Sequence, residues 1–446
     1  MHEGTMIRTA IALVVCAVVS SCVAEPETTT TTGSPVCENG IKDELETDVD
    51  CGGGTCRRCA GLRHCATASD CFSGQCVAVT NTCSALSTVS FADAVSYASS
   101  YKPYVMLSGD LDADGDVDLA AANELASTIT VFRNDGSGVF TSVDATTPDG
   151  FPTGEYPTGG AIADLNRDGI ADVITANYHG NSVSVLLGAG SQNTYTLTSS
   201  SSYPTVAGAE TSNLAVGDLN GDSIVDVIAT NPQAHSVSVF IGRADGTLQP
   251  ANDLQLVMGA EPYSVAIGDF DGDGNNDAAI ADNVSLTIFI ELGNGDGTFT
   301  PGPSQPRVNG QASLILITRD MDLDGKLDLV VANRNSDDVS VLLGRGDGDF
   351  DDAIVSTAGP GPYSLAVTDF NLDAVPDVVT SNFMAGTASV LLGIGNGSFE
   401  PPINAGMTGD YSYGVATGDL NGDGKPDFAT ANALSNDIAV KISTAH

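Results

Sequence analysis

The sequence contains no tryptophan, five histidines, and 16 Lys and Arg residues against 57 Asp and Glu residues, which gives a formal net charge of −41. The absence of tryptophan removes the best aromatic platform for stacking on sugars, although tyrosine can still take that role. Nucleic-acid binding depends on neutralising phosphates with Lys and Arg, so this charge balance argues against a nucleic-acid partner.

Several catalytic motifs are also absent. The sequence has no Gly-x-Ser-x-Gly elbow, no nucleotide-binding loop and no His-Glu-x-x-His motif. These motifs would have indicated an acyl-transfer nucleophile, a phosphate cradle and a zinc site. The sequence therefore gives no direct support for the corresponding enzyme classes.

An acidic nine-residue loop of the form D-x-[DN]-x-D-G-x-x-D occurs seven times, at intervals of 54, 54, 51, 51, 49 and 50 residues. Side chains at loop positions 1, 3, 5 and 9, with a backbone carbonyl at position 7, can surround one hard cation, which suits Ca²⁺. The predicted calcium ligands are Asp110, Asp112, Asp114 and Asp118; Asp164, Asn166, Asp168 and Asp172; Asp218, Asn220, Asp222 and Asp226; Asp269, Asp271, Asp273 and Asp277; Asp320, Asp322, Asp324 and Asp328; Asp369, Asn371, Asp373 and Asp377; and Asp419, Asn421, Asp423 and Asp427.

The seven loops differ in charge and at position 6. The first, fourth and fifth loops have four aspartates each, whereas the others have asparagine at position 3. Position 6 is glycine except for Ser223 and Ala374. If this position requires a positive φ, a non-glycine residue there costs on the order of 1 kcal/mol. We therefore expect the third and sixth sites to be the weakest.

Short β-branched runs between the loops predict four strands in each repeat, as in 328–333 and 339–344. A supersecondary unit with a fixed period near fifty residues indicates an array. Seven such units predict an all-β fold, a seven-bladed β-propeller over 86–446. The last unit lacks its fourth strand, and Phe91 has the same spacing to Tyr104 and Asp110 as Phe350 has to Tyr363 and Asp369. The segment 91–99 is therefore predicted to close the ring against 437–443, which would protect a strand edge.

The segments 268–277 and 293–299, with their counterparts in the other units, resemble FG-GAP/VCBS-type repeats, which are also found in the integrin α-chain propeller. The resemblance covers about residues 86 to 446. It implies an extracellular, calcium-bound propeller that mediates binding, but no particular ligand, because a fold does not fix a function.

The N-terminal region resembles a bacterial lipoprotein signal, with an apolar run over 10–19 followed by Val19-Ser-Ser-Cys22. That run is too short to span a bilayer. We expect a signal peptide over 1–21, a lipid anchor on Cys22 and a Thr/Pro-rich tether over 22–36. The expected location is the outer membrane or cell surface, with membrane contact through the lipid. An ordinary signal peptide and secretion are the alternative.

Residues 37–85 form a predicted cysteine-rich module, which resembles modules of secreted myxobacterial proteins. An even number of cysteines in a short exported segment indicates four disulfides, with zinc ligation as the alternative. The eight cysteines are Cys37, Cys51, Cys56, Cys59, Cys65, Cys71, Cys76 and Cys83.

Two recurring residue types are predicted to lie on the propeller face opposite the acidic loops. Tyrosine occurs six residues before four loops, and asparagine ends the second strand of six repeats, with Asp282 in the fourth. They are candidates for ligand contact, and the alternative is that the asparagines make turns and the tyrosines seal the blade junctions. The candidates are Tyr104, Tyr263, Tyr363, Tyr413, Asn123, Asn177, Asn231, Asn333, Asn382 and Asn432.

These observations predict a monomeric, calcium-stabilised, surface-anchored binding or adhesion module that recognises an extracellular protein or glycan. The alternative is a polysaccharide lyase or hydrolase with its site at the central channel. An enzyme would require converging titratable groups at the channel mouth.

Overall fold

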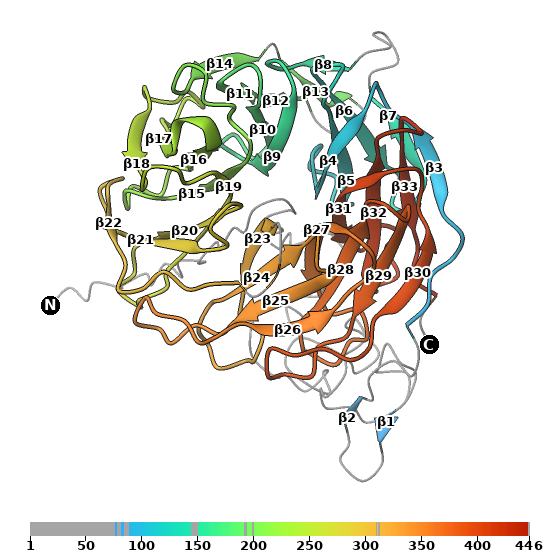
Figure 1. Cartoon of the computed structure of the whole chain (residues 1–446). Coiled ribbons are helices and arrows are strands. Elements are labelled where there is room, and N and C mark those ends of the chain that lie inside the picture. Colours follow the sequence, from blue (N-terminus) through green and yellow to red (C-terminus); the bar gives the residue numbers. More distant parts are fainter. Residues whose placement is uncertain are drawn as a thin grey trace, which may run out of the picture.

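A computed structural model describes residues 89–143, 150–190, 194–198, 200–308, 310 and 313–444, together with the short paired strands β1 (Cys76–Val77) and β2 (Thr82–Cys83). The main body is a ring of seven antiparallel sheets around a central axis (Figure 1). Among the described residues, the one helical element is the three-residue 3-10 turn η4 (Pro232–Ala234). The predicted all-β, seven-bladed propeller is therefore confirmed.

Each blade follows the same order, in which the first strand lies nearest the axis and the fourth lies at the rim (Figure 1). The first three blades are β4 (Pro103–Gly109), β5 (Asp118–Asn123), β6 (Thr128–Asn134) and β7 (Phe140–Ser142); β9 (Pro157–Ala163), β10 (Asp172–Asn177), β11 (Ser182–Leu186) and β14 (Ser201–Pro204); and β15 (Leu214–Gly217), β16 (Asp226–Asn231), β17 (Ser236–Phe240) and β18 (Asn252–Gln255).

Blades 4 to 7 repeat this pattern with little variation. They are β19 (Pro262–Gly268), β20 (Asp277–Asp282), β21 (Ile288–Gly293) and β22 (Phe299–Pro301); β23 (Ser313–Arg319), β24 (Asp328–Asn333), β25 (Asp338–Leu342) and β26 (Ile354–Thr357); β27 (Pro362–Thr368), β28 (Asp377–Asn382), β29 (Thr387–Leu391) and β30 (Ile403–Met407); and β31 (Ser412–Gly418), β32 (Asp427–Asn432) and β33 (Asp437–Lys441), completed by β3 (Val95–Ala98).

The first two blades each have a short additional β-structure. Strand β8 (Phe151–Pro152) pairs with β6, and a hairpin of β12 (Gly188–Ala189) and β13 (Thr196–Leu197) follows β11.

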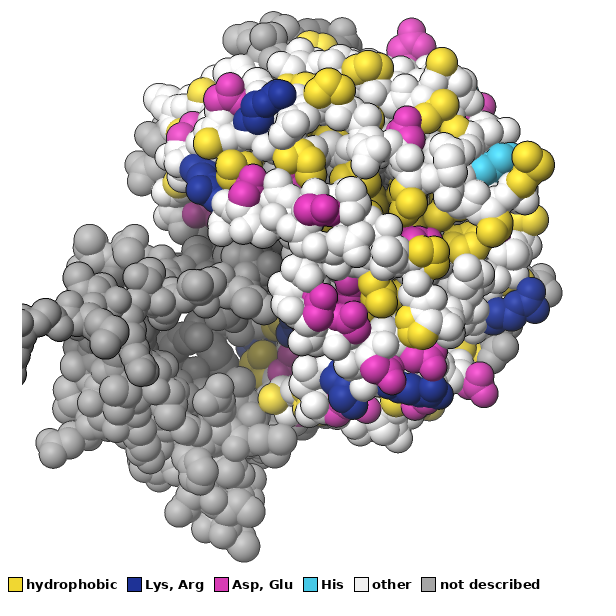
Figure 2. Space-filling view, turned by 90° about the vertical axis from the view of Figure 1, so that its left-hand side faces the viewer, with side chains coloured by type: hydrophobic (Ala, Val, Ile, Leu, Met, Phe, Trp, Pro, Cys, Tyr) yellow, Lys and Arg dark blue, Asp and Glu magenta, His cyan; other side chains and the backbone are white. Residues whose placement is uncertain are grey.

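The core lies between neighbouring blades. All six residues of every second strand are buried, because each blade is covered on its two faces by its two neighbours. This explains why these strands read as nearly continuous apolar runs. The fourth strands at the rim are largely exposed. On the side of the ring seen in Figure 2, charged side chains occur in small separate groups among uncharged ones.

The ring closes as predicted, through a strand that comes from the N-terminal side. Strand β3 pairs antiparallel with β33, and an isolated bridge joins Phe91 to Ser443. The amide of Ala92 donates to the carbonyl of Ile442 at 2.8 Å. The Phe91 ring packs edge-on against two phenylalanines of blades 6 and 7, with centroids 5.7 and 4.9 Å away. Residues more than 330 positions apart in the sequence therefore share one sheet (Figure 1).

The predicted signal peptide, the tether and most of the cysteine-rich module lie outside the described residues. Cys22 falls there, as do the side chains of all eight paired-cysteine candidates. Within the described part of the chain, no helix is long and apolar enough to cross a membrane.

Candidate functional site

The two ends of the propeller have different chemistry. The first strand of a blade ends at an acidic loop, and the second strand returns from that loop to the opposite end. We call the end with the acidic loops the acidic-loop face and the other end the tyrosine face. Each predicted tyrosine lies six positions before its acidic loop on an extended strand, so the two faces are about 20 Å apart.

The aspartate at loop position 9 acts as an internal clip in every blade. One carboxylate oxygen accepts from the backbone amide of loop position 2. The other accepts from a backbone amide 16 residues later, at or just beyond the end of the third strand; these distances are 2.6–3.0 Å. These side chains are fully buried. Sequence reasoning assigned them to metal binding alone, because the amide partner 16 residues later is visible only in the fold.

Burial raises the pKa of these clip aspartates, although the two amide hydrogen bonds oppose the effect. The pKa rises to about 8 for Asp118 and Asp377 and to about 7 for Asp427. It rises to about 6 for Asp172, Asp226, Asp277 and Asp328. Neighbouring loop carboxylates add to the shift. Each loop therefore holds negative charge that is costly without a cation.

The aspartate at position 1 closes the loop on itself. In all seven blades one of its oxygens accepts from the amide of position 6, at 2.7–3.0 Å. Position 6 has a positive φ throughout, including 62° at Ser223 and 69° at Ala374. The predicted left-handed conformation is confirmed, and these two side chains are strained there.

Three loops bring three carboxylates together, with one oxygen from each within 4.8 Å of the others. The three groups are Asp110, Asp112 and Asp118; Asp269, Asp271 and Asp273; and Asp320, Asp322 and Asp328. They belong to blades 1, 4 and 5, which are the loops with four aspartates. In three other loops the side-chain amide of the asparagine at position 3 donates to the carboxylate at position 5, at 2.9–3.0 Å.

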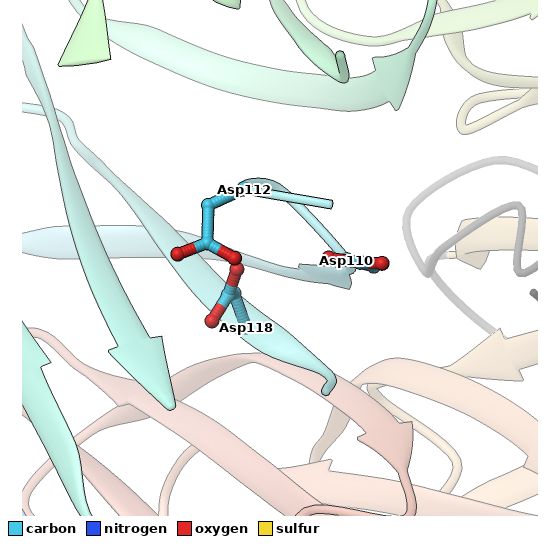
Figure 3. A group of neighbouring side chains, drawn as sticks. All are labelled: Asp110, Asp112 and Asp118. Atoms are coloured by element: carbon cyan, nitrogen blue, oxygen red, sulfur yellow. The ribbon is translucent and has the colours of Figure 1, made fainter. Parts of the chain in front are cut away.

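The loop of blade 1 contains a buried carboxylate without a partner. Asp112 is 1% exposed, and neither of its carboxylate oxygens has a hydrogen-bond partner. Figure 3 shows its carboxylate next to that of Asp118, with Asp110 close by. Burial and the nearby Asp114 and Asp110 raise the pKa of Asp112 to about 6. A buried charge is stable only when it is paired or bound to a metal, so this oxygen-only site fits a hard cation such as Ca²⁺.

On the tyrosine face, the four predicted tyrosines converge on the channel axis from blades 1, 4, 6 and 7. The Tyr104 hydroxyl lies 3.4 Å from that of Tyr263 and hydrogen-bonds to that of Tyr363. The Tyr104 and Tyr413 rings stack with centroids 4.5 Å apart, and Tyr363 meets Tyr413 edge-on at 4.6 Å. These four side chains therefore form one aromatic cluster across the channel.

The six predicted asparagines do not open onto this face. Each is fully buried. The Asn123 amide, for example, donates to Thr128 and Thr130, and its oxygen accepts from Ser99. The other five amides make equivalent bonds to side chains five and seven residues later, or to a carbonyl. The structure therefore does not support ligand contact for the asparagines. Their side-chain amides tie the end of the second strand to the third strand, which differs from the turn-forming role given as the alternative.

Asp282 in blade 4 supports this structural role. As a carboxylate it can only accept, and its partners are donors: the amides of Glu261, Val284 and Ser285, and the Ser285 hydroxyl. The residue seven positions later is Phe289, which has no hydroxyl to accept an amide.

Sequence reasoning missed a second set of residues on the tyrosine face. In five blades the loop before the first strand has a residue with positive φ eight positions ahead of the acidic loop. It is glycine in blade 6 (Gly361, 66°), but Lys102 (61°) in blade 1, Tyr156 (59°) in blade 2, Glu210 (54°) in blade 3 and Tyr411 (59°) in blade 7. We call these four the rim residues. Glycine occurs only once at this aligned position, so the sequence carried only a weak signal of a left-handed backbone.

The rim residues contact the turns that follow the second strands. Lys102 pairs with Glu124 at 2.5 Å, and the Tyr178 hydroxyl donates to Glu210 at 2.6 Å. The Tyr156 ring meets His179 with centroids 4.4 Å apart, and Tyr411 meets Phe383 edge-on at 4.7 Å. A recurring backbone hydrogen bond supports this arrangement. The amide of the residue after the strand-ending asparagine donates to the carbonyl of the rim residue, from Glu124 to Lys102 and from Tyr178 to Tyr156, each at 2.8 Å.

The ring of blades and its acidic loops define the class of protein: a seven-bladed β-propeller built from acidic-loop repeats. The sequence matches the family model described as FG-GAP-like repeat over residues 110–175, 164–229, 218–280, 320–380 and 369–430. These segments cover more than half of the chain, so the protein belongs to the FG-GAP-like repeat family. No curated protein matches the sequence.

The structure is similar to solved proteins of different kinds. One is an Agrocybe aegerita lectin that recognises non-reducing terminal N-acetylglucosamine (20% identity, TM-score 0.50, 74% of this chain and 86% of that one). Another is BBS1N, solved in complex with ARL6DN (11%, 0.55, 80% and 97%). A third is streptogramin B lyase (14%, 0.52, 80% and 98%). At these identities the likeness concerns the fold alone, and it does not separate binding from catalysis.

Proposed function

We propose that this protein is a non-enzymatic binding module that recognises an extracellular protein or glycan through its tyrosine face. The observation that carries the proposal is the set of four rim residues. Each keeps a large side chain in a left-handed conformation, at a cost on the order of 1 kcal/mol that glycine would avoid. Strain of this kind is typical of functional sites. Two of the four residues lie beside the aromatic cluster: Lys102 Nζ is 6.0 Å from the Tyr413 ring centroid, and Tyr411 meets Phe383 edge-on.

Calcium in the acidic loops is part of the proposal, as a structural clamp. The ligands would be the oxygens of loop positions 1, 3, 5 and 9, and the unpartnered Asp112 carboxylate supports this assignment. The ion would supply positive charge that offsets the repulsion between buried carboxylates.

Binding is favoured over catalysis by the state of the channel tyrosines. Burial raises the pKa of Tyr104 and Tyr363 well above the usual value, and raises that of Tyr413 to about 12. These phenols stay protonated at neutral pH, so the centre of the cluster offers hydrogen-bond donors rather than a general base.

Export and anchoring through a lipid on Cys22 complete the proposal. They are supported by the lipoprotein-like segment 19–22 and by the cysteine-rich stretch that follows it. Mass spectrometry of the mature N-terminus tests the anchor, and Cys22→Ser should release the protein from membranes or block its processing. An unmodified N-terminus beyond residue 22 would contradict it.

Glycine substitution provides a direct test of the rim residues. A protein and glycan array with calcium should identify a ligand, and a chelator should abolish its binding. Tyr411→Gly or Tyr156→Gly removes a side chain at a position where Gly361 shows that glycine fits. We expect weaker binding with unchanged or higher thermal stability.

The matched control is Ala374→Gly, which relieves the same kind of strain on the acidic-loop face and should leave binding unchanged. If the rim variants bind as well as the wild type while still folded, the tyrosine face is not the binding surface.

A further inference from the structure

The basic side chains of the tyrosine face differ in how their charge is neutralised. Lys102 forms an ion pair with Glu124. Arg334, at the turn after β24, has no ion pair, since no carboxylate of the described residues lies within 4.0 Å of its guanidinium. Arginines without an ion pair also occur elsewhere among the described residues, as at Arg243, but Arg334 lies against the aromatic cluster.

Aromatic rings hold Arg334 in place instead. Its guanidinium lies 4.9 Å from the Phe383 ring centroid and 5.4 Å from that of Tyr363. A cation–π contact positions the group without neutralising it. The planar edge of a guanidinium stacked in this way keeps its N–H donors, which match the two oxygens of a carboxylate.

The surface beside Arg334 is apolar and partly open. Phe383 packs against Tyr413 with centroids 4.7 Å apart, and against Tyr411 at the same distance. Tyr411 is 44% exposed, and the neighbouring Met384 is 77% exposed. A ligand with a carboxylate and a flat apolar face would contact both parts.

We propose that Arg334, with Phe383 and Tyr411, forms a subsite for a carboxylate-bearing sugar unit, such as a hexuronate within a glycan. The inference rests on the proposed function and specifies its ligand class. The carboxylate would lie against the guanidinium, and the C–H face of the sugar would pack against the rings. Aromatic side chains take this role in the absence of tryptophan.

The acidic residues of the same face favour a sugar over an acidic peptide. Glu210 accepts a hydrogen bond from the Tyr178 hydroxyl, and Glu124 pairs with Lys102. Carboxylates of this kind suit sugar hydroxyls but repel a ligand that offers carboxylates with few donors. In a chain of uronate units each carboxylate is accompanied by hydroxyl donors, so it fits this face better than an acidic peptide does.

The test is calorimetry on the calcium-loaded full chain with two probes: trigalacturonate and the neutral galactotriose with the same linkage. We expect trigalacturonate to bind about tenfold more tightly, as a charge-assisted contact predicts. Arg334→Gln should remove that preference without changing galactotriose binding. Arg334→Lys should restore only part of it, because lysine keeps the charge but lacks the planar fork.

The matched control is Arg243→Gln, which removes the same charge from a turn of blade 3, where Arg243 bonds to Thr247 and Leu248. It should leave the preference intact. Equal affinity of the wild type for the two probes, or no binding of either, would overturn the subsite. A glutamate-rich peptide that binds through Arg334 when trigalacturonate does not would overturn it in favour of a protein ligand.

Failure of the subsite and failure of the proposed function are distinguishable. If another ligand from the array binds and Tyr411→Gly weakens it, the tyrosine face remains the binding surface and only the sugar class is wrong. If no array ligand responds to any rim variant, the binding function itself is wrong.

Discussion

The two faces of this propeller are built from the same repeats but differ in how much they vary. On the acidic-loop face, the clip aspartate and the position 6 amide bond recur in all seven blades with nearly constant geometry. On the tyrosine face, equivalent positions hold Lys102, Tyr156, Glu210, Gly361 and Tyr411. This contrast supports the proposal that the acidic-loop face maintains the ring and the tyrosine face selects a ligand.

Calcium removal acts on the acidic-loop face and should cause the largest loss of stability. Seven loops with clustered carboxylates are stabilised by any ligand that binds the folded state alone. We expect the thermal midpoint to fall strongly in excess EGTA relative to millimolar Ca²⁺, with binding by the tyrosine face lost when the ring unfolds. An unchanged midpoint would show that the acidic loops need no metal.

Removing the closing strand should have the next largest effect. A chain that lacks residues 1–99 loses β3 and the ladder bonds to β33, and it exposes a pairing edge. It should aggregate or melt early, as monitored by light scattering and circular dichroism. A chain that lacks residues 1–85 keeps the closure and should stay soluble. Equal stability of the two chains would refute the closure.

The metal-free protein should become less stable as pH rises. An unfolded aspartate has a pKa near 3.9, whereas the folded clip aspartates have pKa values of about 6 to about 8. Between these limits the folded state binds more protons than the unfolded state, so stability present below about pH 4 is lost by about pH 8. Thermal melts of dialysed, metal-free protein at pH 5 and pH 8 test this. A higher midpoint at pH 8 would contradict the cause given for the shifts.

Single loops should differ in a predictable order. Asp322 lies in a three-carboxylate group, whereas the Asp373 carboxylate accepts from the Asn371 amide at 2.9 Å. Asp322→Ala should therefore reduce the calcium-dependent rise in melting temperature more than Asp373→Ala does. Each variant is measured with calcium and with chelator, so that loss of metal binding is separated from loss of fold. Equal or reversed losses would show that the ranking of the loops is wrong.

The smallest expected effect is a gain in the stability of the folded protein. Ser223→Gly and Ala374→Gly should each stabilise the protein by about 1 kcal/mol, because the left-handed backbone no longer carries a side chain. Denaturant unfolding measures the change. A loss of stability in both variants would mean that the entropy of glycine in the unfolded chain outweighs the relief of strain.

Sequence reasoning was most successful where one pattern repeats. The loop spacing predicted seven blades, and the offset of Phe91 predicted the closing strand, because both depend on a period that seven copies reinforce. It failed for the asparagines. A residue at a strand end can point outward or inward, and repetition alone does not distinguish a ligand contact from a structural bond. The hydroxyls five and seven residues later, as at Thr128 and Thr130, were the available clue.

The sequence by itself determined the blade, the acidic loop and the left-handed position 6 of that loop, because hydrogen bonds and backbone sterics over ten to twenty residues specify them. Only the tertiary structure decided which blades face one another across the channel. It placed Tyr104 against Tyr263 and Tyr363, and Arg334 over Phe383. These contacts join blades that are 49 to 259 residues apart in the chain. No local pattern encodes such contacts, because they arise from ring closure.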